Sequence, residues 1–352
     1  MALLISEEDV RTLLTPEDTL EALEDAYDQY GRGLVRNPIR REMRTSNLKG
    51  GDLPQEDEGD QGISMNFAYA DKYKMAIVKV MTKFNNMKLL THLIDTQSGK
   101  TLAIFHSTWE SYMRVGAEAA IGTKYFARKD ASTLGVLGVG AVGRLVLAFN
   151  LLVRKFDKVY CHAGRAEDSA LAKKYAKEME KKHGIQVIPV EEVEKLVKAS
   201  DIVVSATRAK SPIVKAEWIK PGTHITGIGA DSPQKAEYEP EVFGKMDKIV
   251  IDYGLALETL QMKRAFERGS ISQKDIYGNI GEVVAGIKPG REKDSEITGY
   301  ILTGMTVGYV VILERIYRKA IKQGRGINTK DLTLPSPLFD SLFLTEESQL
   351  VI

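Results

Sequence analysis

Three glycines, at positions 138, 140 and 143, form the pattern in this chain that points most directly to chemistry. They follow an apolar run at 134–137 and precede a stretch with helical periodicity. In such a strand–turn–helix unit, Gly138 allows the tight turn, Gly140 admits a pyrophosphate to the backbone, and Gly143 lets the helix pack on its strand. The phosphates would lie on free N–H groups at the helix N-terminus. The pattern predicts a dinucleotide site, the alternative being a plain strand–helix turn. The cofactor-binding residues predicted here are Gly138, Gly140, Ala141, Val142 and Gly143.

The end of the next strand bears on which dinucleotide is bound. An NAD site usually has an acid about 20 residues past the glycines, where it holds the ribose 2′-OH. In this chain Asp157 precedes that strand and Glu167 lies well past it, whereas His162 and Arg165 stand near its end. These two could pair with a 2′-phosphate, which a carboxylate would repel. We predict NADP, with NAD possible; alternatively, Arg165 is a solvated loop charge.

Composition restricts the possible partners. The 352 residues carry 49 Lys and Arg against 48 Asp and Glu, so no nucleic-acid or membrane-surface partner is expected. The single cysteine, Cys161, excludes an intramolecular disulfide and a cysteine zinc cluster, and no metal site is predicted. The N-terminus lacks a basic signal-peptide region, and the apolar run at 297–313 is interpreted as a buried helix. A cytoplasmic location is expected.

Hydrophobic patterning predicts two domains. Helices capped by Ser6 and Thr15 come first, and an acidic, glycine-rich stretch at 49–62 is expected to be a surface loop. Four strand-like runs follow, and then a helix at 111–128, which together predict an α+β domain with an antiparallel-type sheet. Those runs are 63–69, 75–82, 88–95 and 101–106.

From residue 129 onward strands and helices alternate, which is typical of a Rossmann-type, doubly wound parallel sheet. The predicted strands are 132–137, 158–161, 186–189, 202–206, 224–227 and 248–252. A late helix at 305–322 is expected to return to the first domain. We therefore predict a substrate-binding and dimerisation domain from residues 1–128 with 306–352, and a dinucleotide-binding domain from residues 129–305, both within one α/β chain.

Several ordered blocks stand out along the chain: Asn37-Pro-Ile-Arg40, Met65-Asn-Phe-Ala-Tyr69, Ile77-Val-Lys79-Val-Met-Thr, Asp95-Thr-Gln-Ser-Gly99-Lys-Thr-Leu-Ala, Tyr112-Met-Arg114-Val-Gly-Ala-Glu-Ala-Ala, Pro221 to Glu237, and Gly281 to Arg291. Together they resemble the ornithine cyclodeaminase/μ-crystallin family, which includes archaeal-type alanine dehydrogenases and ketimine reductases. The resemblance implies an NAD(P)-dependent enzyme of amino-acid metabolism that forms a homodimer through the sheet of its first domain.

The resemblance also assigns three basic residues, Arg40, Lys79 and Arg114, to the substrate carboxylate. This is chemically reasonable, because a guanidinium group grips a carboxylate through two hydrogen bonds. For Arg114 the alternative is a charge that covers a helix surface. The competing basic residues are Arg41 and Arg44 for Arg40, and Lys74 for Lys79.

Two segments of the second domain, 205–207 and the loop at Asp231, stand at or just after the ends of predicted strands and should lie at the carboxyl edge of the sheet, where ligands bind. Asp231 is assigned by the resemblance to proton transfer at the substrate nitrogen, with a helix cap as the alternative. Asp231 and Lys79 are the predicted catalytic residues. Ser205, Ala206 and Thr207 should border the cofactor, the alternative being an ordinary strand end.

The predicted reaction is hydride transfer between nicotinamide and the Cα of a small amino acid, its imine or a cyclic ketimine. Two departures from the family pattern affect this prediction. Ile63 stands where cyclodeaminases have a glutamate, which disfavours cyclodeamination, and Tyr309 and Val310 stand near the position of another family acid. The alternatives are a cyclodeaminase of ornithine or lysine with catalytic NAD, and a μ-crystallin-like NADPH-dependent binding protein.

Overall fold

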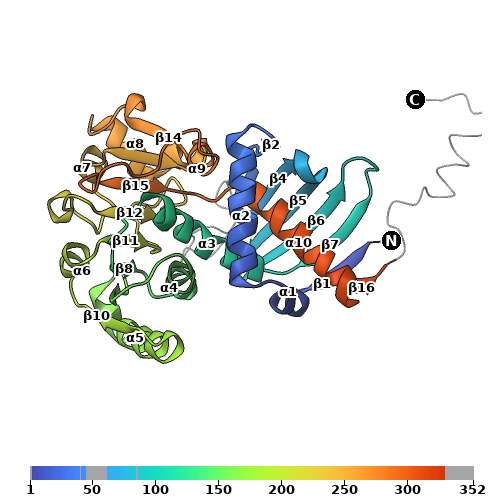
Figure 1. Cartoon of the computed structure of the whole chain (residues 1–352), viewed down its shortest axis with the longest axis horizontal. Helices are drawn as coiled ribbons and strands as arrows, with labels where there is room; N and C mark the ends of the chain where they lie inside the picture. The colour runs from blue at the N-terminus through green and yellow to red at the C-terminus, as the bar shows by residue number, and fades with distance from the viewer. Residues whose placement is uncertain (1, 40, 45–61, 85, 330–352) are drawn as a thin grey trace, which may run out of the picture.

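The computed structural model describes residues 2–39, 41–44, 62–84 and 86–329. Figure 1 shows two lobes, each built around one eight-stranded sheet. The predicted loop at 49–62 falls almost entirely outside the described residues, and so do Arg40 and the chain after 329. Among the helices that are described, none is long and apolar enough to cross a membrane.

The first sheet has the strand order β16-β1-β7-β6-β5-β4-β2, with β3 beside β4. Its strands are β1 (Leu3–Ser6), β2 (Val35–Arg36), β3 (Arg41–Arg44), β4 (Gly62–Ala70), β5 (Met75–Phe84), β6 (Asn86–Asp95), β7 (Thr101–His106) and β16 (Ile327–Asn328). The four predicted strands are β4 to β7. The sheet is mixed and not purely antiparallel, because β1 pairs with β7 in parallel. A parallel partner 100 residues away has no local sequence signal.

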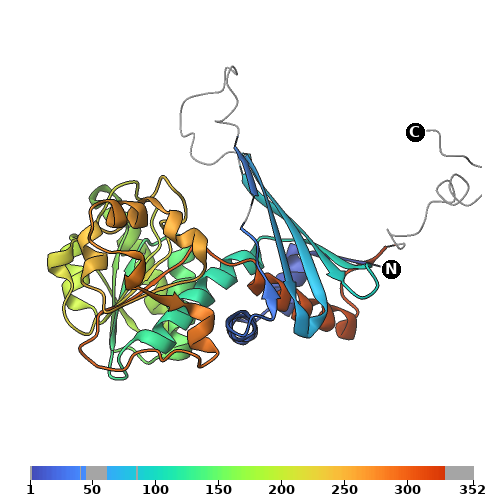
Figure 2. The same ribbon diagram turned by 90° about the horizontal axis from the view of Figure 1, so that it is seen from above.

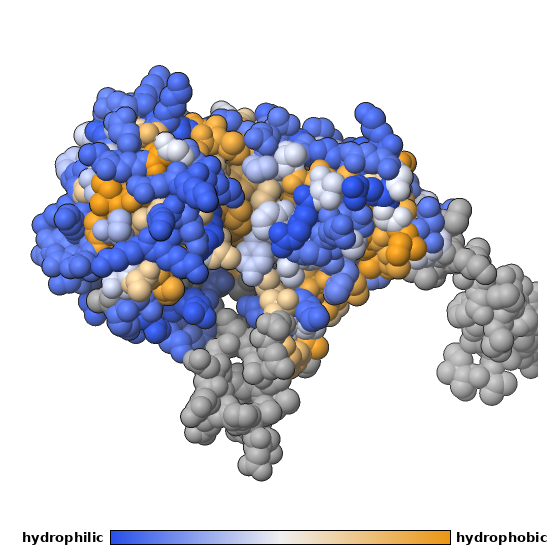
Figure 3. Space-filling view, turned by 90° about the horizontal axis from the view of Figure 1, so that it is seen from below, coloured by the Kyte–Doolittle hydropathy of each residue, from blue (hydrophilic) through white to orange (hydrophobic). Residues whose placement is uncertain are grey.

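Helices cover one face of this sheet, and Figure 2 shows the other face bare. The covering helices are α1 (Glu7–Leu13), α2 (Pro16–Gly31) and α10 (Val307–Gln323). Ser6 and Thr15 form the predicted N-caps, each within a capping box. Along β4, Ser64 and Asn66 are buried, whereas Met65 and Phe67 on the bare face are 40% and 39% exposed. Figure 3 shows hydrophobic side chains at the surface of this lobe.

The second sheet is parallel throughout and has the order β10-β9-β8-β11-β12-β15-β13-β14, which confirms the predicted Rossmann-type fold. Its strands are β8 (Thr133–Leu137), β9 (Lys158–His162), β10 (Gln186–Pro189), β11 (Ile202–Ser205), β12 (His224–Gly227), β13 (Lys248–Ile251), β14 (Ile276–Asn279) and β15 (Thr298–Ile301). Its helices are α4 (Ala141–Val153), α5 (Ser169–His183), α6 (Val193–Ala199), α7 (Pro240–Gly244), α8 (Leu260–Glu267) and α9 (Ile280–Val284).

The interpretation of 297–313 as one buried helix is wrong. Residues 298–301 form β15, a turn follows at Gly304, and α10 begins only at Val307. Gly304 has a φ of +89°, which helical backbone does not allow. A short apolar strand buried on both faces cannot be distinguished from helix by periodicity.

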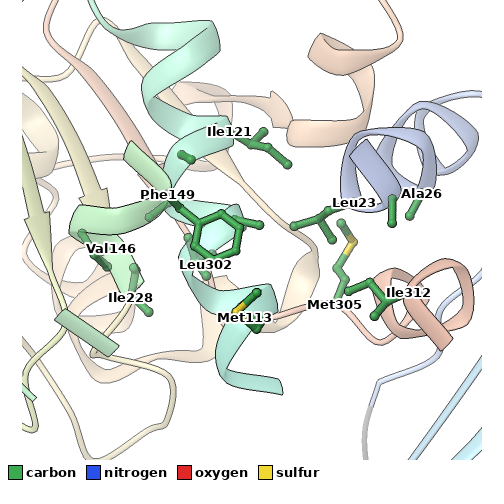
Figure 4. Close-up of a cluster of buried hydrophobic side chains, with 14 of the residues drawn as sticks. Leu23, Ala26, Met113, Ile121, Val146, Phe149, Ile228, Leu302, Met305 and Ile312 are labelled. Atoms are coloured by element: carbon green, nitrogen blue, oxygen red, sulfur yellow. The ribbon is translucent and has the colours of Figure 1, made fainter. Parts of the chain in front are cut away.

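Helix α3 (Trp109–Phe126) lies between the lobes and belongs to the core of both. One continuous cluster of buried side chains runs from the first sheet through α3 to β8 and β9. Figure 4 shows part of it: Leu23, Ala26, Met113, Ile121, Val146, Phe149, Ile228, Leu302, Met305 and Ile312. The side chains that α3 carries are therefore held where the two lobes meet.

Candidate functional site

The glycine-rich turn between β8 and α4 has the geometry of a phosphate cradle. A Cβ on Gly138, whose φ is +99°, would lie 2.4 Å from the carbonyl oxygen of Ala206, and one on Gly143 would lie 1.9 Å from the carbonyl oxygen of Gly138. At Gly140, by contrast, a Cβ would meet nothing within 4 Å. Gly140 caps α4 without a side-chain hydrogen bond, so the helix N-terminus offers its N–H groups to a ligand. These residues fit a dinucleotide pyrophosphate.

The strand ends beside this cradle are fixed by a buried carboxylate, Glu237, for which the sequence predicted no role. It accepts hydrogen bonds from the hydroxyl of Ser205 (2.8 Å), from the N–H and hydroxyl of Thr207 (2.8 and 2.7 Å) and from the N–H of Gly229 (2.9 Å). Glu237 thereby ties the end of β11 to the end of β12. The hydroxyls of Ser205 and Thr207 are engaged with protein, and Ala206 lies with its carbonyl against Gly138.

The two residues predicted to hold a 2′-phosphate differ in their surroundings. The Nδ1 atom of His162 accepts the N–H of Gly164 at 2.9 Å, and its Nε2 lies 3.2 Å from the carbonyl oxygen of Glu191. Burial lowers the pKa of His162, which favours the neutral ring. The structure thus speaks against His162 as a phosphate ligand, since both ring nitrogens contact backbone. Arg165 is exposed just beyond β9.

Asp231 lies in the loop after β12, at the carboxyl edge of the parallel sheet. Its carboxylate is 2.8 Å from Nζ of Lys235, and its side chain is 39% exposed. The helix-cap alternative is wrong, because the next described helix, α7, begins only at Pro240. Asp231 therefore sits in an irregular loop at the ligand-binding edge.

On the helix-covered face of the first sheet, Lys79 and Arg114 converge on one aromatic ring. Nζ of Lys79 lies 3.6 Å from the ring centre of Tyr309, and Cζ of Arg114 lies 5.0 Å from it. The Tyr309 hydroxyl is 2.7 Å from the hydroxyl of Ser111. Lys79 and Arg114 are 5% and 8% exposed, and burial lowers the pKa of Lys79. The competing Lys74 is instead exposed and paired with Asp71.

Arg114 forms an ion pair with Glu118, one turn further along α3. The same carboxylate oxygen accepts the hydroxyl of Tyr27 at 2.9 Å. Burial works against the charge on Arg114, but Glu118, Tyr309 and Tyr27 together outweigh it and raise the arginine pKa. Arg114 is thus a charged group inside the protein and not a charge covering a helix surface.

A turn after β15 connects this cluster to the second lobe. Asp252 accepts the N–H groups of Thr303 (2.7 Å) and Gly304 (2.5 Å), and a Cβ at Gly304 would lie 2.6 Å from Nη1 of Arg114. Just before the turn, the N–H of Leu302 donates to the carbonyl oxygen of Gly227, the last residue of β12 (3.1 Å). Arg114 therefore packs against the same sheet edge that carries Asp231. Arg40 lies outside the described residues.

Strand register changes one inference from the sequence. Asn66 pairs directly with Lys79, so both point to the same side of the sheet, whereas Ile63 lies on the opposite side. Ser64, not Ile63, is the residue that shares the face of Lys79. The side chain at position 63 therefore points away from Lys79, so its being isoleucine and not glutamate does not alter the surroundings of Lys79. Glu110 and Glu118 were also missed, although their spacing of four from Arg114 places all three on one helix face.

Comparisons with known proteins agree with this geometry. The model of the ornithine cyclodeaminase/mu-crystallin family matches residues 2–324. Alanine dehydrogenase of Archaeoglobus fulgidus is 31% identical over 332 residues, which are 93% of this chain and 98% of that protein. The structure of Thermococcus litoralis Δ1-pyrroline-2-carboxylate reductase with NADH and L-proline superposes with a TM-score of 0.83 at 29% identity, covering 93% and 100% of the two chains. An archaeal alanine dehydrogenase dimer with bound NAD gives 0.81 at 28% identity, covering 94% and 99%.

Proposed function

The chain belongs to the ornithine cyclodeaminase/mu-crystallin family, and we propose that it is an NAD(P)H-dependent reductase of the imines of small 2-oxo acids. The general activity is oxidoreduction at the C–N bond of an amino acid, as in the alanine dehydrogenase and pyrroline-2-carboxylate reductase relatives. The observation that carries the proposal is the convergence of two buried cations, Lys79 and Arg114, beside the sheet edge that bears Asp231.

A reduced nicotinamide bound at the glycine-rich turn would supply the hydride for the imine carbon, so that the C=N bond becomes a C–N bond. Arg114 and Lys79, with Arg40, hold the carboxylate next to that carbon. Asp231 donates the proton that the nitrogen gains, acting as a general acid that solvent can reach. Fixing the carboxylate places the imine carbon at a defined distance from the cofactor, which converts a bimolecular step into an oriented one.

The proposal is tested by following reduced-nicotinamide absorbance with two substrates. Oxidation with 1-pyrroline-2-carboxylate alone would establish a cyclic imine reductase. Oxidation with pyruvate that depends on added ammonia would establish an amino-acid dehydrogenase. Ammonia release from L-ornithine or L-lysine with catalytic NAD, and no oxidation of reduced cofactor by either imine, would overturn the proposal in favour of a cyclodeaminase. Cofactor binding without any turnover would favour a binding protein.

We further propose that the enzyme accepts NADPH through Arg165. The support is that β9 ends without an acid and that Arg165 is exposed near its end. With His162 engaged by backbone, one cation is left for the phosphate, so the preference over NADH should be modest. Arg165→Ala is expected to raise the KM for NADPH about tenfold and to leave the KM for NADH unchanged. Equal effects on both cofactors would contradict this assignment.

The proposed assembly is a homodimer formed through the bare face of the first sheet. In this proposal residues 1–128 with 306–352 form the substrate-binding and dimerisation domain, and residues 129–305 form the dinucleotide-binding domain. Large hydrophobic side chains on several strands of that sheet are exposed, which monomers rarely tolerate in a contiguous patch. They are Leu4, Met65, Phe67, Phe84, Leu90 and Ile327. One related structure is a dimer.

The dimer is tested by sedimentation of the wild type and of the double variant Phe67→Glu, Leu90→Glu. Wild type should sediment as a dimer and the variant as a monomer, since buried carboxylates disfavour the interface. Exposed Leu171→Glu, on α5 of the other lobe, is the control and should stay dimeric. A variant that remains dimeric would overturn the proposed interface.

We also propose a cytoplasmic location. Cys161 is the single cysteine and is buried, which fits a reducing compartment.

A further inference from the structure

A carboxylate outside the predicted site, Glu118, forms an ion pair with Arg114. It is completely buried, and it contacts Nη1 of the guanidinium through the oxygen that also accepts the Tyr27 hydroxyl. Arg114 and Glu118 lie on α3, whereas Tyr27 lies on α2. The ion pair is therefore anchored to a second helix, so the guanidinium cannot rotate freely about its side-chain bonds.

The opposite side of the guanidinium is bounded by backbone. A Cβ at Gly304 would lie 2.6 Å from Nη1 and 2.7 Å from Nη2 of Arg114, so only glycine allows this approach. Asp252, which is also fully buried, holds the Gly304 turn in place through two backbone N–H groups. Two carboxylates thus act on Arg114, one directly and one through the turn.

One edge of the guanidinium is not engaged by Glu118. Nε of Arg114 is buried and has no hydrogen-bond partner among the described residues. Nη1 is taken by Glu118, so the edge turned away from that carboxylate consists of Nε and the adjacent Nη2, with Tyr309 as a nearby hydrogen-bonding neighbour. That edge offers two parallel N–H donors, which is the arrangement that a carboxylate accepts.

We propose that Glu118 is a positioning residue for substrate-carboxylate recognition: it occupies Nη1 and thereby presents the Nε–Nη2 edge of Arg114 to the substrate. The inference rests on the proposed function, because it needs a substrate with a carboxylate. A purely neutralising role makes the opposite prediction, since removing a buried negative charge would then strengthen anion binding. The two roles differ in the sign of one measurable effect.

The experiment compares Glu118→Gln and Glu118→Ala with wild type in two assays. One is the Kd for pyrrole-2-carboxylate, a planar acid that cannot accept hydride, measured by fluorescence of the bound reduced cofactor. The other separates KM from kcat for 1-pyrroline-2-carboxylate. Glu118→Ala is expected to raise Kd and KM about tenfold with kcat within threefold, and Glu118→Gln, which retains an acceptor, to raise them about threefold. Glu314→Gln is the control and should change neither constant, since Glu314 is another buried acid paired with an arginine four residues on.

Unchanged or lowered Kd and KM in Glu118→Ala would overturn the positioning role. If wild type reduces no imine, the proposed function has failed, and the binding assay still reports whether Glu118 acts on carboxylate affinity. If Glu118→Ala does not fold, Tyr27→Phe removes the second partner of the same oxygen. It should raise Kd about threefold, and an unchanged Kd would contradict the proposal.

Discussion

The proposed cofactor cradle at Gly138–Gly143 and the proposed carboxylate site around Lys79 and Arg114 differ in the groups that form them. The cradle is backbone: its centre, Gly140, has empty space where a side chain would be. The cluster consists of charged side chains, and Lys79, Arg114 and Glu118 are each at most 8% exposed. Buried charges are costly unless they are paired. The cradle therefore needs glycines that leave room for a ligand, whereas the Lys79–Arg114 cluster needs buried charges that neutralise one another. Mutations should affect the two sites in different ways.

The largest expected effect is in the cluster. Arg114→Met removes the proposed substrate-carboxylate donor and leaves Glu118 without its cationic partner. We expect kcat/KM to fall by roughly 10³-fold or more, and the melting temperature to fall as well, because an unpaired buried charge costs several kcal/mol. Arg32→Met, which breaks an exposed ion pair of the same spacing, should change neither. A folded Arg114→Met enzyme with normal KM would show that the cluster does not bind the substrate.

Asp231 differs from both sites, because it is a partly exposed side chain on a loop of the second lobe. Asp231→Asn is expected to lower kcat about 10²- to 10³-fold while the Kd for NADPH and the melting temperature stay unchanged. Steady-state kinetics, cofactor titration and thermal unfolding of the same preparation measure the three quantities. An unchanged kcat would remove Asp231 from the chemistry and leave Lys79 as the candidate acid.

The same contrast explains what the sequence could predict. The cradle lies within six residues of chain, and its glycines are required by geometry, so their spacing alone identifies it. The cluster combines α2, α3, β5 and α10, and only the resemblance to a family could bring Lys79 and Arg114 together. The sequence did not show on which face of β4 Ile63 lies, because a one-residue difference in register reverses a strand. For His162, a sequence does not show that backbone groups contact both of its ring nitrogens.

Two matched glycine variants sharpen the description of the cradle. In Gly140→Ala the added Cβ meets nothing within 4 Å, so the melting temperature without cofactor should be unchanged, while the Kd for NADPH rises about 10- to 100-fold. In Gly143→Ala the Cβ would collide with the backbone at Gly138, which should cost about 1–3 kcal/mol of stability and lower the melting temperature by a few degrees. Equal loss of stability in both variants would contradict an open cradle.

The smallest expected effect concerns Glu110, which lies on the same face of α3 as Arg114 and has no hydrogen-bond partner for its carboxyl oxygens among the described residues. Burial raises its pKa from 4.5 to about 7, against the nearby charge of Lys79. Between these two pH values the folded protein holds a proton that the unfolded chain has lost. Stability contributed by Glu110 therefore falls as the pH rises through this range, by at most about 3 kcal/mol.

Glu110→Gln should remove this dependence. At pH 5 the variant and the wild type should unfold at nearly the same temperature, because the wild-type carboxyl is then neutral. At pH 8 the variant should unfold a few degrees higher, since it has no carboxylate to ionise in the interior. Glu178→Gln is the control: Glu178 pairs with Arg144 at the surface, and this contact lowers its pKa, so it is ionised at both values. A variant that is no more stable than wild type at pH 8 would mean that Lys79 already compensates the charge of Glu110, and that the cluster is fully paired before any substrate binds.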